Sequence, residues 1–333
     1  MNVAALRRGE IQRLLGGSPV TGPFISLIAI FVLFGLFIPG FLSLRTVSNI
    51  INATTMVGTV TIGVTLLMVS GEFDLSVGAL VAAGGYLFAF NSTGDGSPVV
   101  ALVLAVLIPG LLGAFNGAIL ITTRMPSFIV TLGTGSIFSG AVWLLSGGSL
   151  FQTLEHPPFY DLMNGRLDIV NNLLGSGANF RAAGVWILGL ALVFQYVLTR
   201  TRYGNHIFAT GGNPGAARAQ GVRTNMVKVL NFAISGALSG FAGVLLFSQF
   251  RSVRVATGEG VELNAIAAAV VGGTLLTGGS GSILGGLVGV LLISTLRSGV
   301  VQANIIPADN FEAVVGVTIV GAAILNHWLR GRA

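Results

Sequence analysis

Histidines, carboxylates and lysine are the side chains of this sequence that could support acid–base, metal or phosphate chemistry. The three histidines, His156, His206 and His327, lie far apart in the 333 residues, and the sequence contains no HExxH pattern and no cysteine. Metal and hydrolytic centres usually gather such groups at short, fixed spacings. The single lysine, Lys228, does not end a glycine-rich GxxxxGK[ST] phosphate loop. We therefore expect no catalytic residue, no metal site and no bound cofactor in this chain.

Ion coupling is the next chemistry to consider. Ionisable groups deep in a bilayer usually serve as proton relays or ion ligands, because burying charge there is costly. The relevant residues are Glu72, Asp74, Glu262, Arg297 and Glu312, and all of them fall near the ends of long apolar segments. The sequence therefore indicates no energy source of its own, and uphill movement of a solute would need a partner.

Two sets of uncharged polar residues recur with helical spacing. The first is Thr54, Gly58, Thr61 and Thr65, and the second is Asn231, Ser235 and Ser239. Each set falls on one helix face. Such groups could line a path for a neutral polar solute such as a sugar, and Thr54, Thr61, Thr65, Asn231 and Ser235 are our candidates. They could instead bond between helices or back to their own helix, and both interpretations stay open.

The stretch GGNPGAARAQGV, residues 211–222, contains the signals of a short helix. Asn213 suits an N-cap, Pro214 the first helical position and Gly221 the residue just past the end. About two turns lie between the caps, and a helix this short is marginal alone in water. We expect a partner protein to supply the missing stability.

The side chains of this short helix suit protein docking. Ala216, Ala217 and Ala219 would form a ridge of small residues that fits a groove, and Arg218 and Arg223 would give it a basic flank. The alternative is a helix lying at the lipid headgroups, but alanines are a weak membrane anchor. The pattern favours docking.

A second stretch, GEFDLSVGAL, covers residues 71–80. Asp74 could N-cap a helix that starts at Leu75, with Ser76 in its first turn. Gly71 and Gly78 would permit a tight chain reversal and close helix contact.

Composition shows what kind of fold must position these residues. The chain is 53% hydrophobic and 8% charged, with a mean hydropathy of +0.87, whereas soluble domains are about a quarter charged. Apolar runs that approach the ~20 residues of a membrane span recur throughout. We predict an all-α integral membrane protein with about ten transmembrane helices. The expected spans are 23–39, 47–70, 77–90, 99–121, 128–145, 184–199, 229–250, 263–277, 282–297 and 311–328.

The positive charges indicate the orientation. With a cytoplasmic N-terminus, eleven Lys and Arg residues fall inside and six outside, as the positive-inside rule requires. Both termini are then cytoplasmic. The predicted layout is a cytoplasmic N-terminal segment (1–22), one membrane domain (23–328) with an outer loop at 146–182 and an inner loop at 200–228, and a cytoplasmic tail (329–333).

Four blocks together resemble one family. They are GEFDLSVGAL (71–80), NGAILITTRMPSFIVTLGTGSIFSGAVWLLSGG (116–148), RYGNHIFATGGNPGAARAQGVRTNMVK (202–228) and AIAAAVVGGTLLTGGSGSILGGLVGVLLI (265–293). They occur in the order found in the transmembrane permease subunits of ribose-type sugar ABC importers, and the resemblance covers roughly 45–325. Branched-chain amino-acid permeases are more distant relatives, and the intact DLSVG favours sugars.

The resemblance implies partners and sites. It implies a second permease chain, a cytoplasmic ABC ATPase that binds MgATP, and an extracytoplasmic solute-binding protein, in a bacterial inner membrane. It places a coupling helix at Asn213, Pro214, Ala216, Ala217, Arg218 and Gly221, and a family signature of unassigned role at Asp74, Leu75, Ser76 and Gly78. No role for nucleic acid is implied.

Some questions stay open at this point. The outer loop, with Glu155, Asp161, Arg166, Asp168 and Arg181, is either a dock for the binding protein or a solvated cap. The family often has Asn-Gly where this chain has Arg297-Ser298-Gly299, so the resemblance does not identify the solute. A self-sufficient carrier or channel is the rival from another functional class.

Overall fold

Helices form nearly all of the structure. The computed structural model describes residues 20–304 and 313–317. Six described helices are long and apolar enough to cross a membrane, and two apolar helices are shorter. The six are α3 (Leu44–Val69), α5 (Pro98–Thr123), α6 (Ser127–Ser146), α9 (Ala182–Arg200), α12 (Thr224–Phe250) and α14 (Ile283–Gln302), and the two are α2 (Thr21–Phe37) and α4 (Val77–Ser92). The all-helical membrane fold is confirmed, whereas the count of ten spans stays a prediction.

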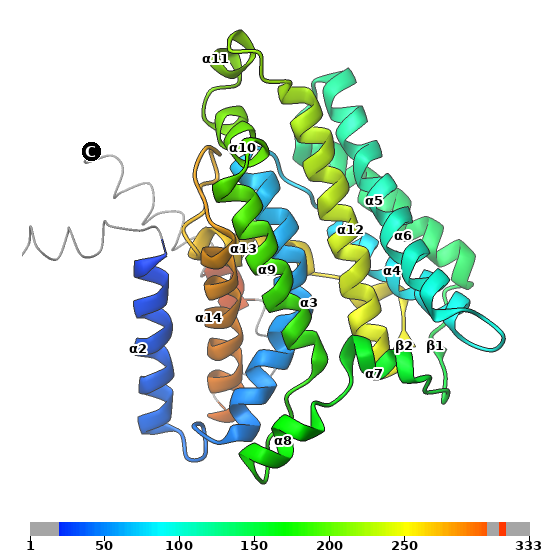
Figure 1. The fold of residues 1–333 in the computed structure, drawn as a ribbon, viewed down its shortest axis with the longest axis vertical. Coiled ribbons are helices and arrows are strands. Elements are labelled where there is room, and N and C mark those ends of the chain that lie inside the picture. The colour runs from blue at the N-terminus through cyan, green and yellow to red at the C-terminus, as the bar shows by residue number, and fades with distance from the viewer. Residues whose placement is uncertain (1–19, 305–312, 318–333) are drawn as a thin grey trace, which may run out of the picture.

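Most of the remaining elements lie towards the two ends of the bundle (Figure 1). One end carries α10 (Arg202–Gly212) and α11 (Pro214–Ala219). The other end carries the following elements of the long loop: β1 (Phe151–Gln152), α7 (Pro158–Asn164) and α8 (Asp168–Leu174), together with β2 (Ser252–Val253) and the 3₁₀ turn η1 (Val255–Gly258). The two predicted long loops therefore lie at opposite ends, and each contains helices of its own.

The helices divide into central and peripheral ones. In their most apolar stretches α3 buries 72% of its residues and α12 buries 61%, whereas α5 and α9 bury only 22%. Exposed leucine, isoleucine, valine and phenylalanine side chains on the peripheral helices suit lipid, which needs no polar surface. The predicted polar sets on α3 and α12 thus belong to the two most buried spans.

Glycines bring α5 and α12 into backbone contact. A Cβ atom added at Gly240 would lie 2.0 Å from the Ala105 carbonyl oxygen, and one added at Gly113 would lie 2.2 Å from that of Phe232. Small residues let helices approach closely in lipid, where dispersion and interhelical bonds hold them together.

Two segments interrupt the helical pattern. Residues 70–76 connect α3 to α4, and residues 251–260 connect α12 to α13 (Val261–Val271). We call them the first and second interrupted segments. Ser76 lies against Gly135, where an added Cβ would be 3.2 Å from the Ser76 Cα. Because Gly135 is near the middle of α6, helix α4 starts deep in the bundle.

The starts of α4 and α13 meet each other. A Cβ added at Gly258 would lie 1.9 Å from the Gly78 carbonyl oxygen, and one added at Gly78 would lie 2.5 Å from Glu262 Oε2. The expected span at 263–277 is wrong as a continuous helix, because α13 has 11 residues. At 1.5 Å per residue it reaches about 16 Å, roughly half of a bilayer core.

Some predictions fall outside the described residues. They concern the N-terminal segment up to residue 19, the tail at 329–333 and most of the tenth span, of which only 313–317 is described as helix. The cytoplasmic position of both termini stays a prediction.

Candidate coupling and translocation sites

The short helix α11 is capped as its sequence predicts. Asn213 Oδ1 accepts a hydrogen bond from the Ala216 N–H at 3.0 Å, and Pro214 is the first helical residue. Gly221 lies beyond the helix with φ +82°, a conformation that costs glycine little. Local capping therefore builds this helix at the end of the bundle (Figure 1).

The ridge of α11 differs from the prediction at one residue. Ala217 is buried, with 5% of its surface exposed, because the chain turns back after the helix and the Val222 N–H bonds the Ala217 carbonyl at 3.0 Å. Ala216 and Ala219 are exposed. The surface that α11 offers to another protein is therefore Ala216 and Ala219, and Ala217 holds the helix to its own chain.

The first turns of α12 connect α11 to the first interrupted segment. Arg218 Nη1 donates to Thr224 Oγ1 at 3.3 Å. One turn further along α12, Lys228 forms an ion pair with Glu72. Both side chains of this pair are largely buried. The structure thus connects α11 to residues 70–76 through the start of α12. The sequence did not indicate this connection.

Helix α10 packs on the end of α3. The Tyr203 hydroxyl donates to Asn231 Oδ1 at 2.7 Å, and Asn231 Nδ2 donates to the Leu66 carbonyl at 3.2 Å. Burial raises the pKa of Tyr203 above its ordinary value, so this hydroxyl stays a donor. A Cβ added at Gly211 would lie 1.9 Å from the Val69 carbonyl oxygen. A displacement of α10 would therefore also displace the end of α3.

Asp74 lies elsewhere than expected. Helix α4 starts at Val77, so Asp74 does not cap a helix that begins at Leu75. Its Oδ1 accepts from the Ser76 N–H at 2.9 Å and from the Ser76 hydroxyl at 2.6 Å. Asn116 Nδ2 of α5 donates to that hydroxyl at 2.8 Å. Asp74 is fully buried, and it organises the turn that precedes α4.

Two of the carboxylates lie at helix starts, as expected. Asp74 and Glu262 are beside the starts of α4 and α13, and these two starts meet inside the bundle. Glu262 Oε1 accepts from the Gly260 N–H at 3.3 Å. The sequence analysis did not identify Asn116 or Thr131 as residues of this site. The Thr131 hydroxyl accepts a hydrogen bond from the Leu75 N–H at 3.0 Å. The signal for Asn116 was available, since it is a lone amide within an apolar run.

The threonine set on α3 is buried between helices. Thr54 and Thr61 donate to the carbonyls of Ile50 and Val57, one turn earlier on α3, both at 2.7 Å. A Cβ added at Gly286 of α14 would lie 2.8 Å from Thr65 Oγ1. These contacts favour the alternative interpretation, in which the hydroxyls bond back to their own helix or contact neighbouring helices.

The polar set on α12 faces α3. Asn231 bonds α3 directly, as described above, and a Cβ added at Gly63 of α3 would lie 2.7 Å from the Ser235 Cα. The Ser235 hydroxyl lies beside the Asp74 carboxyl. In this conformation both polar sets therefore lie in helix contacts, and a solute would meet them only after these helices separate.

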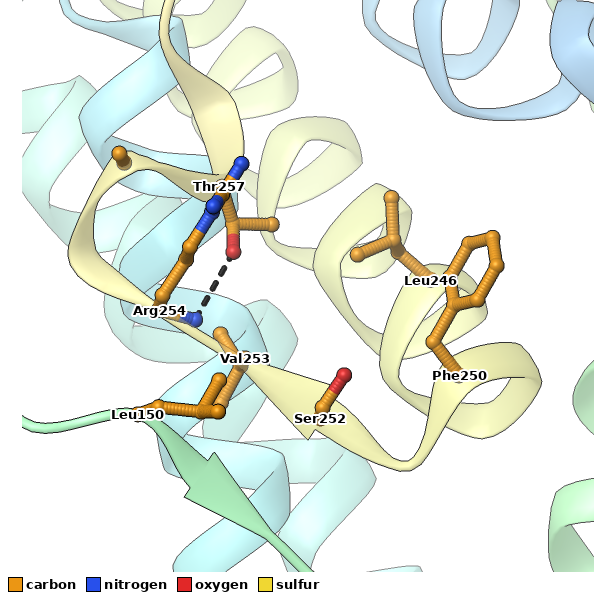
Figure 2. A pocket seen from close by; sticks show the side chains of 8 residues that line it. Leu150, Leu246, Phe250, Ser252, Val253, Arg254 and Thr257 are labelled. Carbon is orange, nitrogen blue, oxygen red and sulfur yellow. Dashed lines mark hydrogen bonds between the residues drawn. The ribbon is translucent and has the colours of Figure 1, made fainter.

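Figure 2 shows a pocket of about 310 Å³ at the other end of the bundle. It lies beside β2 and η1, where Leu246 and Phe250 of α12 face Ser252 and Val253. The Arg254 N–H donates to Thr257 Oγ1 at 2.9 Å. The second interrupted segment is thus held partly by its own side chains.

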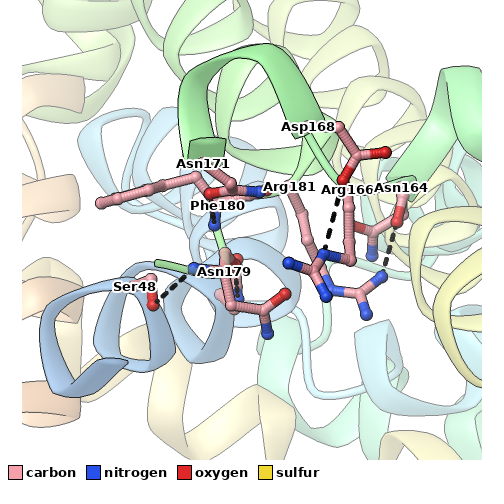
Figure 3. A network of polar contacts seen from close by, with 9 residues as sticks. Ser48, Asn164, Arg166, Asp168, Asn171, Asn179, Phe180 and Arg181 are labelled. Carbon is pink, nitrogen blue, oxygen red and sulfur yellow. Dashed lines mark hydrogen bonds and ion pairs between the residues drawn. The ribbon is translucent and has the colours of Figure 1, made fainter. Parts of the chain in front are cut away.

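The loop at 146–182 is held by polar contacts (Figure 3). The Phe180 N–H donates to Asn171 Oδ1 at 2.7 Å, and the Asn179 N–H donates to Ser48 Oγ of α3 at 3.2 Å. Figure 3 also shows the guanidinium of Arg181 directed at the Asn164 carbonyl, with Nη1 to oxygen 2.9 Å. This end of the loop is a folded cap fixed to α3.

Arginines collect beside this cap. Arg45, Arg166 and Arg181 line a cavity of about 510 Å³. Burial and the nearby Arg166 lower the pKa of Arg181 from its ordinary value. Asp168 is 3.7 Å from Arg166. Of the five charged residues named for this loop, as either a dock or a solvated cap, three therefore lie together. Asp161 pairs with His156 at 3.1 Å, and Glu155 Oε2 accepts from the Gly94 N–H at 2.9 Å.

Comparison with known proteins gives consistent matches over most of the chain. The model of the family described as "Branched-chain amino acid transport system / permease component" matches residues 46–323. The ribose import permease protein of Bacillus subtilis (strain 168) is 31% identical over 321 residues, which cover 92% of each chain. An inner membrane ABC transporter permease protein of Escherichia coli (strain K12) is 33% identical over 83% of each chain.

A third relative extends this group. The autoinducer 2 import system permease protein of Salmonella typhi is 29% identical and aligns with 92% of this chain and 85% of its own. No solved structure gives a significant match. Since the family model spans both interrupted segments and the coupling stretch, the chain belongs to this family of ABC-transporter permease components and is a multi-pass protein of the inner membrane.

Proposed function

We propose that this chain is the membrane-spanning subunit of an ABC importer and forms the translocation path for a sugar or a sugar-like polyol. The observation that carries the proposal is the similarity to a ribose import permease across 92% of both chains. The polar sets on α3 and α12 now lie in helix contacts, but their hydroxyls and amides carry no charge and would suit a neutral solute once the helices separate.

The proposed partners follow from the two ends of the bundle. A cytoplasmic ABC ATPase, which binds MgATP, docks on Ala216 and Ala219 of α11. An extracytoplasmic binding protein delivers the solute at the end that carries α7 and α8. A second permease chain, identical or related, completes the path. This chain itself binds no cofactor and catalyses no reaction.

The proposed mechanism uses the contacts of α11 and α12. Movement of the docked ATPase displaces α11, and the Arg218–Thr224 bond and the Lys228–Glu72 ion pair pass that displacement to residues 70–76. Helix α3 then shifts against α14, which exposes Thr54, Thr61 and Thr65 to the solute, while Asn231 and Ser235 separate from α3. Weak binding along the path favours release, so selectivity resides largely in the binding protein.

Two other functions have specific observations in their favour. The family description names branched-chain amino acids, and uptake of leucine would support that solute class. The buried Asp74 and the partly buried Glu262 would suit an ion-coupled carrier, because buried carboxylates often mark ion pathways. A carrier would transport without an ATPase.

The test is uptake into proteoliposomes that contain the tagged chain and the proteins that co-purify with it in mild detergent. Labelled ribose, other monosaccharides and leucine are compared, with MgATP and with a non-hydrolysable analogue. We expect uptake of a sugar that requires MgATP and a binding protein. Uptake of leucine would show that the solute is a branched-chain amino acid and not a sugar. Uptake by the chain alone would show that the protein is a self-sufficient carrier and not a subunit of an importer.

A further inference from the structure

A cavity of about 640 Å³ opens at the end of the bundle that carries α11. It lies where α5 ends, α6 begins and α12 starts beside α11. Its lining includes the cations Arg124, Arg218 and Lys228 and one carboxylate, Glu72. The cavity includes Arg218 of α11, but Ala216 and Ala219 are not among its lining residues.

The lining has an excess of positive charge. Lys228 and Glu72 compensate each other in their ion pair. Arg218 donates to the neutral hydroxyl of Thr224, so its charge is not cancelled there. Arg124 is exposed and ends α5 in the left-handed conformation, with φ 59°. Two guanidinium groups of the lining thus remain without a carboxylate in the lining, and the cavity favours an anion.

The wall below the cations is apolar. Leu120 and Ile121 of α5 line the cavity. The lining residue Pro126 directly precedes α6, whose Phe128, Ile129 and Leu132 are all at least half exposed. A charged cavity with exposed apolar residues next to it in the chain suits a phospholipid, which combines a charged headgroup with acyl chains.

We propose that this cavity binds the phosphate of an anionic phospholipid, with Arg124 and Arg218 as its ligands. Guanidinium groups bind phosphate oxygens through paired, charge-assisted hydrogen bonds, and basic pockets between membrane helices are suited to lipid headgroups. The bound headgroup would lie next to the Lys228–Glu72 ion pair. The proposal does not depend on which solute the permease carries.

The experiment is native mass spectrometry of the detergent-purified complex after titration with phosphatidylglycerol or phosphatidylcholine. The variant is Arg124→Asn, since asparagine tolerates the left-handed conformation. The matched control is Arg251→Asn, because Arg251 also ends a long helix in that conformation, with φ 53°, at the opposite end of the bundle. We expect Arg124→Asn to lower phosphatidylglycerol affinity about tenfold, the loss of one charge-assisted contact, and Arg251→Asn to leave it unchanged.

Further arms identify the source of the phosphate. Inorganic phosphate at millimolar concentration should not displace the lipid, and phosphatidylcholine should bind equally to all variants. Equal retention of phosphatidylglycerol by the wild type and Arg124→Asn would overturn the proposal. Displacement by inorganic phosphate would also overturn it, because the site would then belong to a free anion. Size-exclusion elution identical to the wild type shows that each variant is folded.

Discussion

The second interrupted segment meets the start of α4, which directly follows the first segment, and the two segments are held in different ways. Residues 70–76 are bonded by side chains of other helices, since Ser127 and Thr131 of α6 accept the N–H groups of Phe73 and Leu75. Residues 251–260 are held by the exposed Arg254–Thr257 bond within the segment and by the pairing of β2 with β1 of the loop at 146–182. Non-helical backbone at membrane depth needs such partners.

The difference extends to what each segment contacts. Through Glu72 and Lys228 the first segment is tied to the end that carries α11. Through β2, which pairs with β1, the second is tied to the opposite end. Because Gly258 of the second segment lies against Gly78, two residues after the first segment, one contact lies between the expected ATPase side and the expected solute side. The predictions below alter this contact and then each segment in turn.

Gly258→Ala should have the largest effect. Its added Cβ would lie 1.9 Å from a backbone oxygen of Gly78, which no side-chain rotation relieves, and overpacking of this kind costs about 1–3 kcal/mol or more. We expect loss of the monodisperse protein in detergent. Gly140→Ala is the control, because no described atom lies within 4 Å of its added Cβ. Equal yield and melting temperature for both variants would refute the contact.

Two substitutions of Asp74 should differ in how much they lower the stability of the protein. Asp74→Ala removes the acceptor of two Ser76 hydrogen bonds and should destabilise the protein by about 1–3 kcal/mol. Asp74→Asn retains an oxygen at Oδ1 and should keep most of the stability. Thermal unfolding measured in detergent tests this order. If Asn is as damaging as Ala, the negative charge is required, which would favour the ion-coupled carrier.

The Lys228–Glu72 ion pair should show coupling. Each of Lys228→Gln and Glu72→Gln leaves a largely buried charge without its partner, whereas the double variant leaves none. We expect each single variant to lower ATP-driven uptake several-fold and the double variant to recover part of it, with a coupling energy of about 1 kcal/mol. Additive losses in the double-mutant cycle would show that the pair does not act as a unit.

The smallest expected losses of stability compare one hydrogen bond in each interrupted segment. Ser127→Ala and Thr257→Ala each remove one hydroxyl that accepts a backbone N–H, from Phe73 and Arg254 respectively. The first bond is partly buried and the second is exposed, so we expect about 1 kcal/mol for Ser127→Ala and a few tenths for Thr257→Ala. The reverse order of unfolding temperatures would contradict the comparison.

The success of the sequence analysis follows the range of the interactions involved. The cap of α11 was predictable because Asn213, Pro214 and Gly221 act on adjacent backbone. The burial of Ala217 was not, since it depends on how the chain turns back after α11. Hydropathy also predicted a continuous span at 263–277, where glycines and polar residues after Val271 end the helix early.

The depth of Asp74 was the least predictable feature. It results from the contacts that its neighbours Ser76 and Leu75 make with Asn116 and Thr131, which are more than 40 residues from Asp74 in sequence. A carboxylate that follows an apolar run is normally placed at the membrane surface, and only the return of the chain into the bundle puts it inside. The contacts of the signature residues are therefore tertiary ones, which a local pattern does not predict.

The most direct test of the account is a cross-link from the exposed ridge of α11. The chain has no cysteine, so Ala216→Cys carries a single photoreactive label, and Gly140→Cys on α6 is the control. After photolysis in native membranes, we predict that Ala216→Cys is joined to a protein that hydrolyses ATP and that Gly140→Cys is not. If active permease labelled at Ala216→Cys cross-links to no ATPase, α11 is not the coupling helix and the importer mechanism is wrong.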